Sequence, residues 1–314
     1  MSLDLDDQWS YMKVRGDEGW DKFPSYLDIV VPYVLDLLDE LDIRITFFIV
    51  GQDAAIAKNR EVLCTIKERG HEIGNHSFHH ESWLKTYSKE KIKEEIIRAE
   101  EAILQATGEK TTCFRGPGFS WSADLLSILS DRGYLCDSST LPTFIGPVAR
   151  MYYFWTSNLT RDEKNNRKEL FGSFKDGFRP IKPYYWQVGT QNKIIEIPVS
   201  TIPVIKLPFH LSYLLYLSGY SLNLMRFYLN SAIWFCKLTK TEPSFLLHPL
   251  DLIGGDQIPE LAFFPGMNIS SAQKICIFQE VIKTLSRHFQ IINMSEYARR
   301  LSMRNNLRVV NINQ

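Results

Sequence analysis

The chain has 314 residues, of which 45% are hydrophobic and 13% aromatic, so it can bury a large core and is not a disordered protein. Its 36 basic residues balance 36 acidic ones, which leaves no net charge to attract nucleic acid. The five cysteines are odd in number and lack a paired spacing, which predicts buried thiols in a reducing compartment rather than disulfides or a cysteine metal cluster.

The first residues of the chain are acidic and have the pattern of a strand. They lack the basic and apolar regions of a signal peptide. We therefore expect a cytoplasmic protein. Peripheral attachment to the inner face of the membrane is the alternative. The sequence leaves the oligomeric state open.

Short apolar or β-branched runs alternate with longer helical patterns along the chain. The predicted strands are Ser2–Asp6, Ile45–Val50, His71–Gly74, Thr112–Phe114, Tyr134–Cys136, Lys193–Pro198, Ser244–His248 and Gln290–Ile292. Amphipathic helices are predicted at residues 25–42, around Pro32, and at residues 88–108, with Ser88 as N-cap and Gly108 as the end. This alternation favours an α/β fold, a (β/α) barrel of about seven or eight strands.

The interval from about Leu141 to Asn192 breaks the alternation, because it is polar, aromatic and rich in glycine and proline. We expect an elaborated loop over one face of the barrel rather than a separate domain. Residues 1–314 then form one domain, with a loop and helical insertion at about 141–240 between barrel elements.

The segment from Leu207 to Met225 contains no acidic or basic residue over 19 positions, a length that approaches a membrane span. Pro208, His210, Gly219 and Asn223 interrupt it and disfavour insertion into a bilayer. Two packed helices are the favoured interpretation. Contact with a membrane surface or a lipid tail is the lesser alternative.

Charged and imidazole side chains follow several predicted strands. In a barrel of this type, the C-terminal ends of the strands form the active face. Those positions hold Asp4, Asp6, Asp7, His76, His80, Arg115, Asp137 and His248. We expect them to converge.

Two neutral imidazoles and one carboxylate suit zinc or another divalent transition metal, with positions left for water and substrate. The four-residue separation of His76 and His80 lets both rings face one ion. Spacing alone does not exclude His76 with His79 as the pair, and His71, at a strand start, is interpreted as a structural side chain.

The acidic strand end offers a similar choice. Asp4 and Asp6 share one strand face by the period of two, so one could bind the metal and the other act as a base. A solvated turn is the alternative interpretation of these carboxylates. Arg115 precedes the glycine-rich turn "GPGFSW", whose backbone N–H groups could approach an oxyanion.

Five segments together resemble the polysaccharide deacetylases of the NodB-homology type, carbohydrate esterase family four. "HSFHH", residues 76–80, is similar to the metal motif H-S/T-x-x-H, and "ITFFIVGQDA" to the strand and turn before it. "FRGPGFSWS" is similar to the R-x-P motif, "GYLCDSS" to the D-S motif and "FLLHPLD" to the L-x-H motif. The segments occur in the order of the family over roughly residues 1 to 300, and the resemblance implies a distorted, NodB-like barrel.

Carried over by residue, the resemblance implies that His76, His80 and an aspartate bind the metal. A second aspartate is then the catalytic base and His248 the catalytic acid. Arg115 orients the base, and Asp137 orients and tunes His248.

The sequence departs from the family motifs at two places. "SLDLDDQ" stands where the family has an adjacent acidic pair, so we assign Asp4 as base and Asp6 as ligand, with Asp7 as rival ligand. Gly116 and Gly118 replace a proline and a tyrosine, which leaves a backbone donor at Gly118 but removes an aromatic wall.

The resemblance implies a metal-dependent hydrolase, with zinc as the expected ion, that removes an N-acetyl group from a sugar. Its expected partner is an N-acetylated sugar of a surface glycan or of an intracellular glycan precursor. We expect no binding to nucleic acid, and contact with a membrane surface is possible but not favoured. The alternatives are a deformylase or deacetylase of a polyprenyl-linked sugar, a hydrolase of small amides, and a catalytically dead glycan-binding module.

Overall fold

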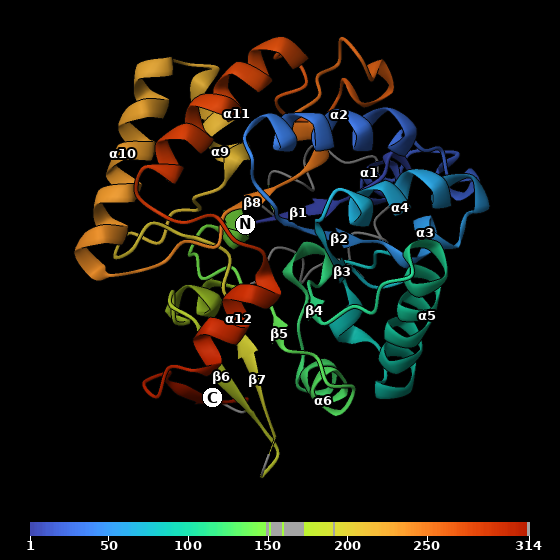
Figure 1. Cartoon of the computed structure of the whole chain (residues 1–314), viewed down its shortest axis with the longest axis vertical. Coiled ribbons are helices and arrows are strands. Elements are labelled where there is room, and N and C mark those ends of the chain that lie inside the picture. The colour runs from blue at the N-terminus through green and yellow to red at the C-terminus, as the bar shows by residue number, and fades with distance from the viewer. Residues whose placement is uncertain (149–150, 152–158, 160–172, 191, 313–314) are drawn as a thin grey trace.

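A mixed sheet of nine strands forms the centre of this computed structural model, which describes residues 1–148, 151, 159, 173–190 and 192–312 (Figure 1). The strands are β1 (Ser2–Leu5), β2 (Thr46–Ile49), β3 (Glu72–Asn75), β4 (Cys113–Phe114), β5 (Cys136–Asp137), β6 (Tyr184–Val188), β7 (Asn192–Glu196), β8 (Leu246–Leu247) and β9 (Val309–Asn311). Their order is β8-β1-β2-β3-β4-β5-β7-β6-β9. Neighbouring strands from β8 to β7 run parallel, and β6 is antiparallel to β7.

The parallel part of the sheet confirms the predicted α/β fold. Within the described ranges, no strand pairing joins the edge strands β8 and β9, so hydrogen bonds do not close the sheet into a barrel. The edge beyond β7 consists of β6 and β9, which pair with each other in parallel.

The predicted strands overlap β1 to β5, β7 and β8, but the prediction of a strand at Gln290–Ile292 was wrong. That apolar run is an irregular link into the next helix, and the backbone nitrogen of Met1 donates to the carbonyl of Ile292 (2.8 Å). Sequence analysis missed β6, although its alternating burial is the signal of a strand. It also missed β9, a short and largely exposed edge strand without such a pattern.

Helices lie around the outside of the strands in Figure 1, with α9, α10 and α11 grouped together. The described helices are α1 (Gln8–Arg15), α2 (Leu27–Glu40), α3 (Gly51–Ala55), α4 (Arg60–Glu68), α5 (Lys89–Thr107), α6 (Ala123–Asp131), α9 (Leu211–Ser218), α10 (Leu222–Thr239), α11 (Ser271–Ser286) and α12 (Met294–Ser302). The two helices predicted in detail correspond to α2, which continues through Pro32, and α5. The hydroxyl of Ser88 accepts from the N–H of Lys91, and Gly108 ends α5 with a left-handed φ of 71°, as predicted.

The uncharged segment forms two helices that pack against each other, α9 and the first part of α10. Leu211, Leu214, Leu215 and Met225 from this segment are buried in the core. None of the described helices is both long enough and apolar enough to cross a membrane.

The predicted insertion at 141–240 lies partly outside the described residues, which omit 149–150, 152–158, 160–172 and 191. Its described part is more ordered than a loop, because β6 and β7 form an antiparallel hairpin of the central sheet. The loop predicted at 141–192 therefore contains a strand.

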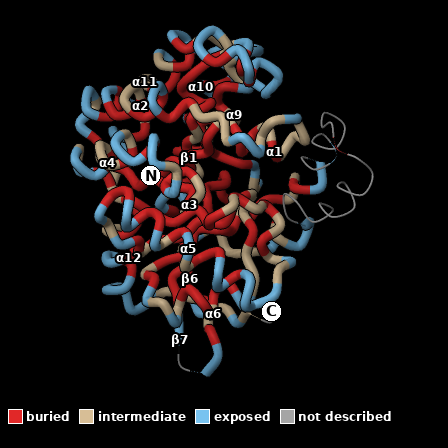
Figure 2. The backbone as a smooth tube through the Cα atoms, turned by 90° about the vertical axis from the view of Figure 1, so that its right-hand side faces the viewer, coloured by how far each residue is buried: buried red, intermediate tan, exposed pale blue. Residues whose placement is uncertain are grey.

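Side chains on both faces of the sheet are buried, because the consecutive β2 residues Phe47 and Phe48 point to opposite faces and neither is exposed. Figure 2 shows buried backbone along the strands and exposed backbone mainly on the outer turns and helices. Such burial on two faces is typical of parallel strands covered by helices, and it makes the strand ends rigid supports for the residues that follow them.

All five cysteines are free. Cys113, Cys136 and Cys236 are buried, as predicted for structural thiols. Cys276 is exposed and Cys64 partly exposed, so burial does not extend to these two.

Candidate active site

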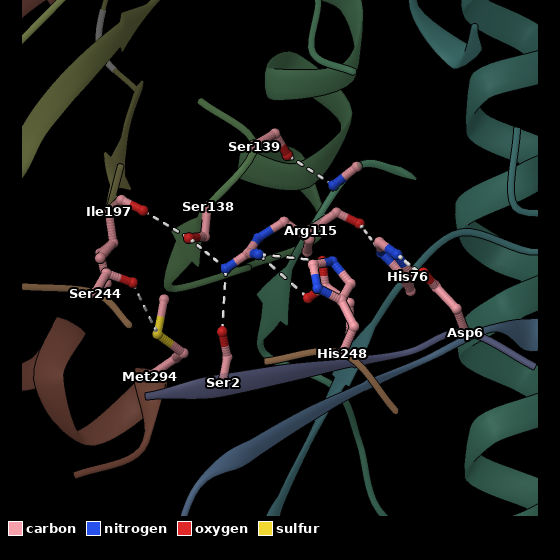
Figure 3. Close-up of polar contacts among 12 residues, drawn as sticks. Ser2, Asp6, His76, Arg115, Ser138, Ser139, Ile197, Ser244, His248 and Met294 are labelled. Carbon is pink, nitrogen blue, oxygen red and sulfur yellow. Dashed lines mark hydrogen bonds and ion pairs between the residues drawn. The ribbon is translucent and has the colours of Figure 1, made fainter. Parts of the chain in front are cut away.

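The C-terminal ends of four parallel strands bring the predicted site residues to one edge of the sheet. Asp4 and Asp6 lie at the end of β1, His76 follows β3, Arg115 follows β4 and His248 follows β8. Leu3 of β1 is opposite Leu247 of β8, so the next positions, Asp4 and His248, lie on neighbouring strand ends. Parallel strands thus place residues from distant parts of the chain side by side (Figure 3).

Asp6, His76 and His80 form a buried group whose potential ligand atoms all lie within 4.8 Å of one another. Oδ1 of Asp6 is 2.9 Å from Nε2 of His80 and 3.4 Å from Nε2 of His76. Burial by itself would raise the pKa of Asp6, but the two imidazoles outweigh burial and hold this pKa below its ordinary value. The carboxylate of Asp6 is therefore ionised beside two imidazole nitrogens.

The atoms of this group fit a divalent metal ion. Nδ1 of His76 lies 2.6 Å from the carbonyl oxygen of Arg115, so Nδ1 donates to this oxygen and Nε2 keeps a lone pair toward Asp6 (Figure 3). Although both imidazoles lie close to the buried Oδ1 of Asp6, no described residue donates a hydrogen bond to this oxygen. A carboxylate oxygen and an imidazole lone pair that face each other are stabilised by a cation between them.

The loop from His76 to His80 is held in a strained conformation. Ser77 and His80 have left-handed φ angles of 62° and 53°, which residues other than glycine rarely adopt. The side-chain oxygen of Asn75 accepts from the N–H of Ser77 (2.8 Å), and the buried carboxylate of Glu95 on α5 accepts from two further N–H groups of the loop. These contacts fix the two rings in their positions.

The structure separates Asp6 from its rivals. Asp7 is buried at the N-cap of α1, where Oδ1 accepts from two backbone N–H groups at 2.7 and 3.0 Å. His79 points away from Asp6, with Nδ1 against Glu95 and 37% of its side chain exposed. Nδ1 of His71, just before β3, accepts from the backbone N–H of Ile45 (3.2 Å), in keeping with the interpretation of His71 as a structural side chain.

Arg115 forms an ion pair with Asp4 in the candidate site. Nη1 of Arg115 lies 3.2 Å from each carboxylate oxygen of Asp4. Nη2 donates to the hydroxyls of Ser2 (3.2 Å) and Ser138 (3.0 Å), and the arginine side chain is fully buried (Figure 3). This cation fixes the position of the Asp4 carboxylate.

His248 is paired with Asp251, three residues further along the chain. Oδ2 of Asp251 lies 3.5 Å from Nδ1 of His248 and accepts from the backbone N–H of His248 (2.9 Å). Burial would lower the pKa of His248, but the carboxylates of Asp251, Asp4 and Asp6 raise it to about 9. His248 is therefore a protonated imidazolium at neutral pH.

Asp137, predicted as the partner of His248, lies elsewhere in the site. The hydroxyl of Ser139 donates to Oδ1 of Asp137 (2.5 Å), and no described contact joins Asp137 to His248. Burial raises the pKa of Asp137 to about 6, and the pKa of the neighbouring Glu196 is raised further, by burial and by the charge of Asp137. The carboxylate that contacts His248 is Asp251, because the Pro249–Asp251 turn folds back onto the histidine.

Two side chains from the start of α9 also reach His248, and sequence analysis missed both. The hydroxyl of Ser212 lies 3.4 Å from Nδ1 of His248. The ring of His210 is 6.0 Å from that of His248, and burial, assisted by the charge of His248, lowers its pKa to about 3. No sequence signal connects these residues with the site, whereas the i, i+3 spacing of His248 and Asp251 was available in "HPLD".

The turn after Arg115 depends on glycine. A Cβ at Gly116 would lie 2.0 Å from the carbonyl oxygen of Ser120, and Gly118 has a left-handed φ of 59°. The N–H of Gly116 donates to Ser139 (2.8 Å), whereas no described residue accepts from the N–H of Gly118. Gly118 therefore keeps the backbone donor that sequence analysis predicted.

A family model described as polysaccharide deacetylase matches residues 17–136, which include His76, His80 and Arg115. Residues 17–136, 120 of the 314 residues, therefore carry the sequence pattern of this family. Among curated relatives, a chitin deacetylase of Pestalotiopsis sp is 32% identical over 35% of this chain and 37% of its own length. A chitooligosaccharide deacetylase of Sinorhizobium fredii is 31% identical over 33% of this chain and 48% of its own.

The matches to these curated polysaccharide deacetylases thus span less than half of either relative. Among solved structures, a putative polysaccharide deacetylase from Mycobacterium smegmatis superposes with a TM-score of 0.58 and 18% identity. It covers 98% of this chain and 93% of its own, which confirms the polysaccharide deacetylase fold over nearly the whole chain.

Proposed function

We propose that the protein is a metal-dependent hydrolase that removes an N-acetyl group from a sugar of a surface glycan or its intracellular precursor. The observation that carries the proposal is the convergence of a candidate metal group (Asp6, His76, His80), an arginine-held carboxylate and a protonated imidazole at one sheet edge. The named activities of the curated deacetylases support the choice of an N-acetylated sugar.

Asp6, His76 and His80 would hold the ion, and two imidazoles with one carboxylate match Zn²⁺. When bound, such an ion would lower the pKa of a water molecule to about 7 and polarise the acyl carbonyl. Removal of the ion should therefore abolish turnover while leaving the sheet intact.

Asp4 is the proposed general base. Asp4 is not one of the three residues of the candidate metal group, and Arg115 orients its carboxylate. The Asp4 carboxylate can therefore take the proton of the attacking water. The N–H of Gly118 is the proposed donor to the oxyanion that forms as the carbonyl carbon becomes tetrahedral.

His248 is the proposed general acid. Hydrolysis of an amide needs a proton on the departing nitrogen, and His248 carries that proton at neutral pH because carboxylates raise its pKa to about 9. Asp251 holds the ring and stabilises its protonated form. The cycle closes when the proton taken by Asp4 returns to His248.

The proposal is tested by metal analysis together with acetate release from N-acetylglucosamine oligomers. The wild-type protein should bind about one divalent ion and release acetate only in the metal-loaded form. His80→Ala should lose both properties. His79→Ala is the matched control, because His79 is adjacent in sequence but faces Glu95.

Metal binding without acetate release from any N-acetylated sugar would favour the glycan-binding module instead. Full metal occupancy in His80→Ala, with loss in His79→Ala, would contradict the ligand assignment. Release of acetate or formate only from a lipid-linked sugar would favour the polyprenyl alternative.

A further inference from the structure

Helix α10 is apolar on two opposite faces. Met225, Leu229, Ile233 and Cys236 are buried against the core. The opposite face carries exposed apolar side chains at a helical spacing of three, seven and four positions, which we call the α10 stripe: Leu224 (43% exposed), Phe227 (71%), Trp234 (58%) and Leu238 (62%). The stripe runs ~21 Å along the helix axis.

The stripe lies at the periphery of the molecule. Figure 1 shows α10 at an outer edge of the fold, with α9 and α11 on its inner side. Two further exposed rings, Tyr216 and Tyr220, lie at the turn between α9 and α10, where their hydroxyls are 2.9 Å apart. Several exposed apolar side chains along one helix face, interrupted here by Asn230 and Ser231, are typical of an interaction surface.

The stripe lies in a segment whose charged residues are all basic. From Ile197 to Thr241 the chain contains four basic residues, Lys206, Arg226, Lys237 and Lys240, and no aspartate or glutamate, although the whole chain is neutral. Arg226 is paired with Glu280 of α11. Lys237 and Lys240 are exposed at the C-terminal end of α10, and neither forms an ion pair within the described ranges.

We propose that the α10 stripe docks on an anionic phospholipid surface. Aromatic rings and leucines would enter the boundary between headgroups and acyl chains, while Lys237 and Lys240 contact the phosphates. The helix lies in the plane of the surface, since its opposite face is packed in the core. The same face of a second copy complements the lysines less well, because its residues 197–241 contain no carboxylate side chain.

The helix pair connects this surface with the candidate active site. The first turn of α9 contacts His248, because the hydroxyl of Ser212 lies 3.4 Å from Nδ1 of that residue. A short turn then leads from α9 into α10. Docking would therefore act on a helix pair whose first helix contacts His248. The docking itself does not depend on the proposed deacetylase function.

Co-sedimentation of the full-length protein with vesicles tests the inference. The protein should bind vesicles of phosphatidylcholine mixed with phosphatidylglycerol, and binding should weaken with added salt and in phosphatidylcholine alone. The double variant F227S/W234S should lower the partition coefficient by roughly 10²-fold, since two large apolar side chains no longer insert. K237A/K240A should lower it on the order of tenfold.

The matched control is I29S/L104S, which removes two exposed apolar side chains from α2 and α5, each 50% exposed. It should bind vesicles like the wild type, and all variants should keep the wild-type circular dichroism and melting temperature. The inference is overturned if the wild type ignores anionic vesicles or if F227S/W234S binds as well as the control. It is also overturned if the wild type is a dimer that F227S/W234S converts to a monomer, because the stripe is then covered by a second copy.

Discussion

Oδ2 of Asp251 accepts a hydrogen bond from the backbone N–H of His248 and lies 3.5 Å from Nδ1 of the same residue. One carboxylate thus contacts both the main chain and the ring of the proposed acid. Pro249 starts the turn that returns Asp251 to His248, and Asp251 is buried. The protonated state of His248 follows from this local turn together with the charges of Asp4 and Asp6.

Asp251→Asn should move the alkaline limb of the kcat profile to lower pH. His248 acts as an acid only when protonated, and its pKa is raised to about 9, so the wild-type rate should fall as the pH rises through about 9. Without the nearby carboxylate the pKa should drop by roughly 1–3 units. A pH series of acetate release measures the shift. A limb that moves in Asp137→Asn and stays in place in Asp251→Asn would restore the pairing predicted from sequence.

His248→Ala should reduce kcat by roughly 10²–10⁴, the usual contribution of a general acid, and leave the metal content unchanged. His248 is not part of the candidate metal group. Because Asp251 acts through His248, the double variant H248A/D251N should be little slower than H248A alone. Losses that multiply in the double variant would show that the two residues act independently.

Asp4→Asn and Asp6→Asn should separate base from ligand. Asp4→Asn removes the base but leaves Asp6, His76 and His80 in place, so it should keep the ion and lose turnover. Asp6→Asn should lose the ion as well, because the amide is a weaker ligand than the carboxylate. Metal analysis beside acetate release distinguishes the two variants, and the reverse pattern would exchange the two assignments.

Gly116→Ala should destabilise the turn after Arg115. Its Cβ would lie 2.0 Å from the backbone oxygen of Ser120, which cannot move without displacing the turn. We expect a loss of about 1–3 kcal/mol in the free energy of unfolding and a lower turnover. Gly219→Ala is the control, since its Cβ would approach a backbone oxygen only to 3.3 Å. Equal stability of the two variants in urea unfolding would contradict the close approach.

Much of the fold and part of the candidate site were predictable from local sequence. The helix of residues 88–108 has its cap residues at both ends, and the strands before Asp6, His76 and Arg115 are apolar runs bounded by polar residues. Such signals lie within a few neighbouring residues, so they do not need the rest of the chain. The order of the motifs along the chain also indicates a resemblance to the polysaccharide deacetylases without reference to the fold.

Tertiary structure decided which of the neighbouring polar residues lie together in the candidate site. Spacing left His79 and Asp7 as rivals, and the choice depends on α5, which provides Glu95 to His79, and on the N-terminus of α1, which Asp7 caps. The partner of His248 depends on the direction of a single turn, and no periodicity in the sequence specifies it. Contacts between distant segments decide such choices, because each side chain binds whatever the packed fold brings within a few ångströms.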